Sequence, residues 1–137
     1  MPRRKKLTSG LWYHVYNRGF RKMLIFRSPR DCERFERKIG YYSEKCHVFV
    51  KAYSIMGNHF HLMVKELHGG SITLFMQRLG QSFAVYFNIK YHKKGPVFDS
   101  RFNAKAVDDF EYYKEVKKYI LKNPIKIKSG DNYSKIK

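Results

Sequence analysis

The sequence predicts an α+β fold of the ferredoxin-like, split βαβ kind. Short segments in which apolar and polar residues alternate indicate strands, and longer segments with apolar residues every three or four positions indicate helices. The segments follow the order strand, helix, strand, strand, helix, strand, and one more helical segment comes last. We therefore expect an antiparallel sheet of four to five strands with helices on one face and an added, tyrosine-bearing helix at the C-terminal end.

The first half of the pattern contains a strand, a helix and a β-hairpin. Residues 11–17 alternate and are rich in aromatic and β-branched side chains, which favours a strand. Ser28 precedes Pro29, and a serine cap followed by proline at the first helical position is typical of a helix start. Residues 48–55 and 58–65 then form two strands joined by a short turn. The apolar stripe of the helix between them is Cys32, Phe35, Ile39 and Tyr42.

The second half adds a long helix, a strand and the last helix. Ser71 caps the long helix, and residues 98–107 alternate as in a strand. The last helix begins at Asp108 or Asp109 and ends before Pro124, because the residue before a proline avoids the helical region. The inward positions expected on the long helix are Phe75, Leu79, Phe83 and Tyr86. On the last helix they are Phe110, Tyr113, Val116 and Ile120.

A strong positive charge points to a polyanionic partner. The chain has 137 residues, with 29 Lys and Arg against 11 Asp and Glu, which gives +18, and nucleic acid is the commonest polyanion. The sequence has neither a long apolar run nor a lipidation motif, either of which would favour binding to a membrane. Cys32 and Cys46 match no zinc spacing and fit a reduced, cytoplasmic setting. We expect one domain over residues 1–137, with a basic arm at 1–10 and a loose basic tail at 125–137.

His59 and His61 flank Phe60 in the strand expected at residues 58–65. Residues two apart in a strand point to the same face, so the two imidazoles project side by side while Phe60 turns into the core. Two imidazoles held in this way are half of a site for a divalent metal, although such a pair can also be structural or merely exposed. His14 could join the metal shell, but a hydrogen-bonded histidine within the sheet is the interpretation we favour.

Tyr119 and Asn123 are four residues apart on the last helix and so lie one above the other on one face. A phenol can attack phosphorus, but its pKa of about 10 means that it needs help from a nearby cation. Mg²⁺ or Mn²⁺ bound by His59 and His61 would give that help. Since Mg²⁺ prefers oxygen ligands, the amide of Asn123 is a candidate third ligand. Tyr112 is the rival nucleophile.

Four segments, in order along the chain, carry a family resemblance: Tyr13–Gly19 (YHVYNRG), Gly57–Val64 (GNHFHLMV), Gly95–Phe102 (GPVFDSRF) and Tyr119–Pro124 (YILKNP). They resemble the single-tyrosine HUH transposases, and in particular the REP-associated branch of that superfamily. The resemblance implies that Tyr119 is the nucleophile. It implies metal ligation by His59, His61 and Asn123, although a Gln often fills the last position in related transposases.

By this resemblance the protein would cleave and rejoin hairpin-containing, single-stranded DNA through a 5′-phosphotyrosine, with Mg²⁺ or Mn²⁺ as the cofactor. Two alternatives stay open: a nucleic-acid-binding protein with a degenerate site, and a metal-dependent phosphoesterase in which water attacks. Related transposases form homodimers that exchange the tyrosine helix, whereas the REP-associated kind can be monomeric, so both arrangements stay open. The candidate DNA contacts are Arg3, Arg4, Lys5, Lys6, Arg18 and Arg101.

Overall fold

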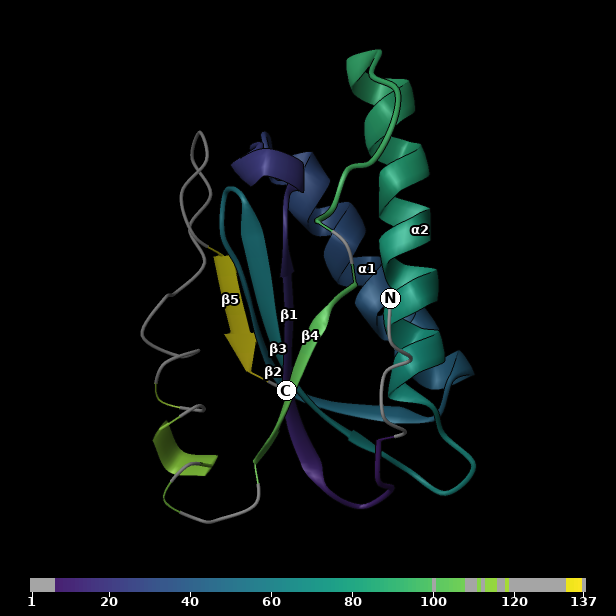
Figure 1. Ribbon diagram of the computed structural model, residues 1–137, viewed down its shortest axis with the longest axis vertical. Coiled ribbons are helices and arrows are strands. Elements are labelled where there is room, and N and C mark those ends of the chain that lie inside the picture. Colours follow the sequence, from purple (N-terminus) through teal and green to yellow (C-terminus); the bar gives the residue numbers. More distant parts are fainter. Residues whose placement is uncertain are drawn as a thin grey trace.

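The computed structural model describes residues 7–99, 101–107, 111, 113–115 and 118, and the backbone of residues 133–136. An antiparallel sheet of five strands, in the order β4-β1-β3-β2-β5, forms one layer, and two helices lie against it (Figure 1). This order confirms the predicted fold class. The strands are β1 (Trp12–Arg18), β2 (Val48–Ile55), β3 (His59–Glu66), β4 (Asn103–Val107) and β5 (Tyr133–Ile136). The helices are α1 (Pro29–Lys45) and α2 (Ile72–Tyr91), and a 3-10 turn, η1, spans Phe20–Lys22.

Both helices begin where their capping residues predict. The Ser28 hydroxyl accepts a hydrogen bond from the Asp31 amide at 3.3 Å, and Pro29 occupies the first helical position, where its missing N–H costs nothing. The Ser71 hydroxyl accepts from the Leu74 amide at 3.1 Å in the same way. These caps fix the register of each helix, and therefore the side chains that each helix turns toward the sheet.

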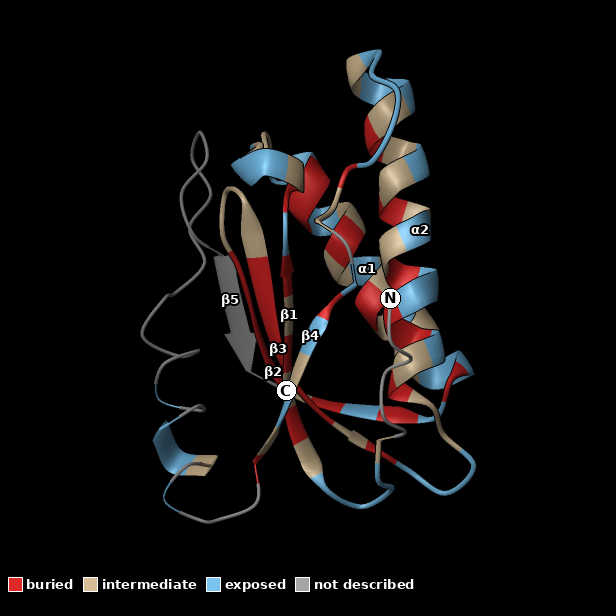
Figure 2. Ribbon diagram, in the orientation of Figure 1, coloured by how far each residue is buried: buried red, intermediate tan, exposed pale blue. Residues whose placement is uncertain are grey.

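The core lies between the helices and one face of the sheet (Figure 2). Every second residue of β1 and β3 faces this core, and its members include Tyr13, Val15, Phe60, Leu62 and Val64. Phe75, Leu79 and Phe83 of α2 close the core from the other side and are fully buried. The intervening residues of β1 and β3 must therefore lie on the opposite face of the sheet, which the two helices leave uncovered.

The open face of the sheet has a small apolar cluster of its own. Ala52, Met63 and Val107 are buried there, and Trp12 and Tyr113 pack against them. Glu111, 113–115 and Lys118 are helical, as predicted for the last helix, whose expected start at Asp108 or Asp109 lies outside the described residues. Tyr119 and Asn123, together with Tyr112, lie outside the described residues.

Two predictions about strands need correction. The fourth strand begins at Asn103 rather than at residue 98, because Phe98 makes only a single bridge to Gly19 and packs its ring against Phe60. The prediction of a loose tail over residues 125–137 is wrong for Tyr133–Ile136, which pairs with β2 as strand β5. The outer edge of β2 offers backbone N–H and C=O groups to any extended segment, and such pairing needs no apolar pattern in the sequence.

Candidate metal and nucleic-acid site

His59 and His61 lie next to each other on β3, on the open face of the sheet. Their ring centroids are 5.0 Å apart and the rings are nearly perpendicular, at 88°. Phe60 between them is 2% exposed and points into the core, as the alternation along a strand requires. Because β3 pairs with β1 on one side and with β2 on the other, the backbone below the two imidazoles is held in place from both sides.

Each of the two histidines has a polar partner at its Nδ1 atom. The Asn58 side-chain oxygen lies 2.8 Å from Nδ1 of His59, so this nitrogen donates and Nε2 carries the lone pair. Nδ1 of His61 lies 2.9 Å from Nε2 of His14, and the two rings are stacked with their centroids 5.0 Å apart. The preferred interpretation of His14, as a hydrogen-bonded histidine within the sheet, is confirmed.

The three histidines are neutral at neutral pH. Burial, together with smaller contributions from the neighbouring His14 and His59, lowers the pKa of His61 to about 3. Burial, with a contribution from the Lys105 ammonium, lowers the pKa of His14 to about 4. Burial also lowers the pKa of His59. Only a neutral imidazole keeps a lone pair for a cation, so burial prepares these rings to act as metal ligands.

The described residues fit one half of a divalent metal site. Among the residues that the structure describes, no three or more His, Cys, Asp or Glu side chains converge as a metal-binding group. The metal donors among the described residues are therefore the two adjacent, neutral imidazoles of His59 and His61. His14 does not join them as a third metal-binding side chain. Two nitrogen donors suit Mn²⁺ better than Mg²⁺, and either ion would need oxygen ligands in addition.

A cleft of about 640 Å³ adjoins His59 where β1 ends and β3 begins. Two of the predicted DNA contacts, Arg18 and Arg101, line it. The Arg18 Nε atom donates to a carboxylate oxygen of Asp99 at 2.5 Å, and this ion pair lowers the pKa of Asp99. The cleft is lined by Tyr16, Asn17, Arg18, Lys22, Asn58, His59, Asp99, Arg101 and Asn103. The remaining candidates, 3–6, lie outside the described residues.

Asn58 and Asp99 are the site residues to which the sequence analysis gave no role. Asn58 stands directly before His59, inside a segment that was already singled out. Asp99 is 81 positions from Arg18, and the two come together because the bridge between Gly19 and Phe98 joins their neighbours. The signal that could have found this pair is the presence of both residues in segments that carry the same family resemblance.

A split βαβ sheet with a His-Phe-His pair on its open face is the arrangement of an HUH-type domain. The family model described as "Transposase IS200 like" matches residues 7–123. The chain therefore belongs to the IS200-like transposase family, and its activity is that of a transposase, an enzyme that cleaves DNA. No curated protein matches the chain.

Two solved structures show the same fold. One is a REP-associated tyrosine transposase bound to a REP hairpin, with a TM-score of 0.70 and 17% identity, covering 90% of this chain and 72% of that one. The other is a putative transposase from Deinococcus radiodurans R1, with a TM-score of 0.61 and 13% identity, covering 89% of this chain and 97% of that one. None of the helices in the described ranges is long and apolar enough to cross a membrane.

Proposed function

We propose that this transposase cleaves and rejoins DNA beside a hairpin, through a covalent bond between Tyr119 and a 5′ phosphate. The observation that carries the proposal is the pair of neutral imidazoles, His59 and His61, beside a cleft lined by arginines. Tyr113, six residues before Tyr119, packs over the same face of the sheet, on Trp12, with ring centroids 5.9 Å apart. The REP hairpin bound by the similar transposase supports a hairpin substrate.

His59 and His61 would hold Mg²⁺ or Mn²⁺, with the Asn123 amide as the third ligand. Such an ion, when bound, polarises the non-bridging oxygens of the phosphate. The protein itself fixes the orientation of the ligand rings: Asn58 holds His59 and His14 holds His61. A ligand ring held by a second partner keeps its tautomer and its direction before the ion arrives.

The proposed chemical step exchanges one phosphodiester bond for another. The Tyr119 phenol oxygen attacks the phosphorus, the bond from phosphorus to the 3′ oxygen breaks, and that oxygen leaves as a 3′-OH after taking up the proton that the phenol gives up. The 5′ phosphate stays on the tyrosine, and a second 3′-OH can reverse the step and join new ends. Arg18 and Arg101 would hold the flanking phosphates in the cleft, and residues 3–6 would follow the backbone further along.

A denaturing gel tests this function. Protein is incubated with Mn²⁺ and labelled hairpin DNA that carries a single-stranded flank, and covalent attachment appears as label that migrates with the protein. We expect Tyr119→Phe to abolish attachment while hairpin binding persists, and Tyr112→Phe, the matched control, to keep it. Attachment in the Tyr119→Phe variant would exclude this nucleophile. Free cleaved ends without attachment would indicate a phosphoesterase, and binding without cleavage would indicate a degenerate site.

A further inference from the structure

A groove of about 500 Å³ runs between the exposed sides of α1 and α2, on the side of the molecule away from His59 and His61. Its lining residues are Arg30, Glu33, Arg34, Arg37, Tyr86 and Lys90. The spacing of the three arginines places them on one face of α1. They span about 10 Å of helix, which is the axial length of about three successive phosphates on one DNA strand.

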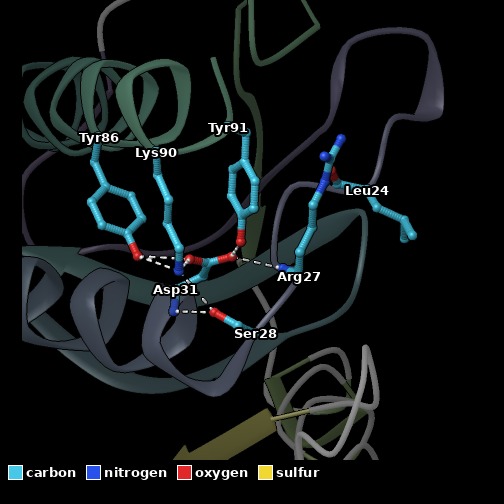
Figure 3. A network of polar contacts seen from close by, with 7 residues as sticks. All are labelled: Leu24, Arg27, Ser28, Asp31, Tyr86, Lys90 and Tyr91. Atoms are coloured by element: carbon cyan, nitrogen blue, oxygen red, sulfur yellow. Dashed lines mark hydrogen bonds and ion pairs between the residues drawn. The ribbon is translucent and has the colours of Figure 1, made fainter. Parts of the chain in front are cut away.

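The positive charge in this groove is largely uncompensated. The charge of Lys90 is neutralised by an ion pair with the buried Asp31, whose carboxylate lies 2.7 Å from the ammonium (Figure 3). The ion pairs of the described part of the chain involve none of the three arginines. Helix α2 carries no acidic residue, and Glu33 is the single acid among the lining residues. An anion entering the groove therefore meets three guanidinium groups and one carboxylate.

A second hollow continues the same charge toward the other end of the helix pair. It measures about 310 Å³, and its lining includes Lys45 of α1 and Arg78 of α2. From Arg30 to Lys45 the helix advances about 22 Å, which corresponds to about six base pairs of duplex DNA. The cations along α1 therefore extend far enough to lie beside about six base pairs of a duplex.

The groove presents fixed charges rather than open aromatic rings. The Arg34 guanidinium lies 4.6 Å from the centre of the Tyr86 ring and donates to the Ser82 hydroxyl at 3.3 Å. The Tyr86 hydroxyl donates to Asp31 at 2.6 Å (Figure 3). A ring that is covered by a guanidinium and tethered at its hydroxyl offers little room for a stacked base, and proteins that bind single strands rely on such stacking. The chemistry of the groove suits phosphates, not unpaired bases.

We propose that this groove holds the phosphate backbone of the double-stranded hairpin stem, while the unpaired flank of the same DNA reaches the histidines on the open face of the sheet. The inference rests on the proposed function, because the DNA has a double-stranded stem only if the substrate is a hairpin. It assigns to the helix layer a role in substrate recognition that is separate from cleavage.

Fluorescence anisotropy tests the groove with two labelled probes: a DNA hairpin with a stem of about 12 base pairs, and an unstructured single strand of the same length. The variant is Arg30→Gln/Arg37→Gln, which leaves the Arg34 contacts in place. The matched control is Lys93→Gln/Lys94→Gln, which removes the same charge from the exposed turn after α2. We expect the groove variant to bind the hairpin roughly tenfold more weakly near 0.1 M salt, and its salt slope to fall by about 1.8.

Binding of the single strand should change much less, and the control pair should leave the affinity for the hairpin close to that of the unaltered protein. Equal losses for both probes, an equal loss in the control pair, or no loss at all would overturn the proposal. Covalent attachment to the hairpin substrate, measured at saturating protein, separates this question from the proposed function. It should persist in the groove variant, whereas Tyr119→Phe should lose attachment and keep the groove-dependent affinity.

Discussion

The Nε2 atom of His14 lies 2.9 Å from the Nδ1 atom of His61, and this contact joins β1 to β3 on the open face of the sheet. A ring that uses Nδ1 in this contact can bind a cation only through Nε2. For His61 to act as a ligand, its Nδ1–H must then donate to His14. His14 thereby sets both the tautomer and the direction of the proposed ligand, although it is no ligand itself.

We expect His14→Ala to weaken Mn²⁺ binding by about 10- to 100-fold, the usual effect of removing a residue that orients a metal ligand. The measurement is a titration of the free Mn²⁺ electron paramagnetic resonance signal with protein, which needs no DNA and no activity. His68→Ala removes an exposed histidine elsewhere and should leave the affinity unchanged. An unaltered affinity in His14→Ala would show that His61 needs no such support.

Asp31 is fully buried in the first turn of α1 and ties the two helices together (Figure 3). It accepts hydrogen bonds from Lys90 at 2.7 Å, Tyr86 at 2.6 Å and Tyr91 at 2.5 Å. Asp31→Asn removes the counter-charge of Lys90, so we expect the free energy of unfolding at pH 7 to fall by about 3 kcal/mol. Urea unfolding measures this, and Glu33→Gln, an exposed neighbour, should shift stability by no more than about 0.5 kcal/mol.

The same carboxylate predicts a change of stability with pH. Burial alone would raise the pKa of Asp31, but the hydrogen bonds from Lys90, Tyr86 and Tyr91 outweigh burial and hold the pKa below 3.8. The unfolded chain therefore takes up this proton first, so the contribution of Asp31 is complete above 3.8 and declines as the pH falls toward the lower, folded-state pKa. The stability gap between the unaltered protein and Asp31→Asn should be constant above about pH 5 and narrow below about pH 4. A gap that stays constant down to pH 3 would contradict this assignment.

The features that the sequence predicts well depend on neighbouring residues. Ser28 and Ser71 mark their helix starts because a cap bonds an amide only three residues away. His59 and His61 share a face because alternation is a property of any strand. The order of the elements along the sequence is then enough to predict the order of the strands in the sheet, because the split βαβ pattern has one common strand order.

The features that the sequence did not predict depend on distant residues. The partner of Arg18 is Asp99, and strand β5 pairs with β2, across separations that no local pattern encodes. The partner of His61 is likewise 47 positions away, on another strand. The assignments of Tyr119 and Asn123 fall outside the described residues and stay predictions.

Gly19 directly follows β1, at a point where the chain has no room for a side chain. A Cβ atom there would lie 2.1 Å from the backbone oxygen of Met23, which cannot move aside as a flexible side chain would. We expect Gly19→Ala to lower the free energy of unfolding by about 2 kcal/mol. It should also displace Arg18 from the cleft and weaken DNA binding.

Gly40 supplies the control for Gly19. It lies within α1, and a Cβ atom there would meet nothing within 4 Å. Gly40→Ala should therefore raise stability by about 0.5 to 1 kcal/mol, because alanine loses less backbone freedom in a helix than glycine does. Thermal unfolding of the two variants should shift in opposite directions, and a Gly19→Ala variant as stable as the unaltered protein would show that the turn relaxes without cost.

The contact of Tyr113 with Trp12 favours a tyrosine helix that serves its own chain. The two rings, 5.9 Å apart, belong to one subunit, and Trp12 lies on the same face of β1 as His14. A helix that continued from Tyr113 would advance about 9 Å by the position of Tyr119. We therefore expect no complementation when Tyr119→Phe and His61→Ala chains are coexpressed: the mixture should form no more covalent DNA adduct than either variant alone.

The control is coexpression of unaltered chains with Tyr119→Phe chains, which should form adduct in proportion to the share of unaltered chains. Adduct in the mixture of the two defective chains would instead place Tyr119 in the site of a partner subunit, as in a dimer that exchanges its last helix.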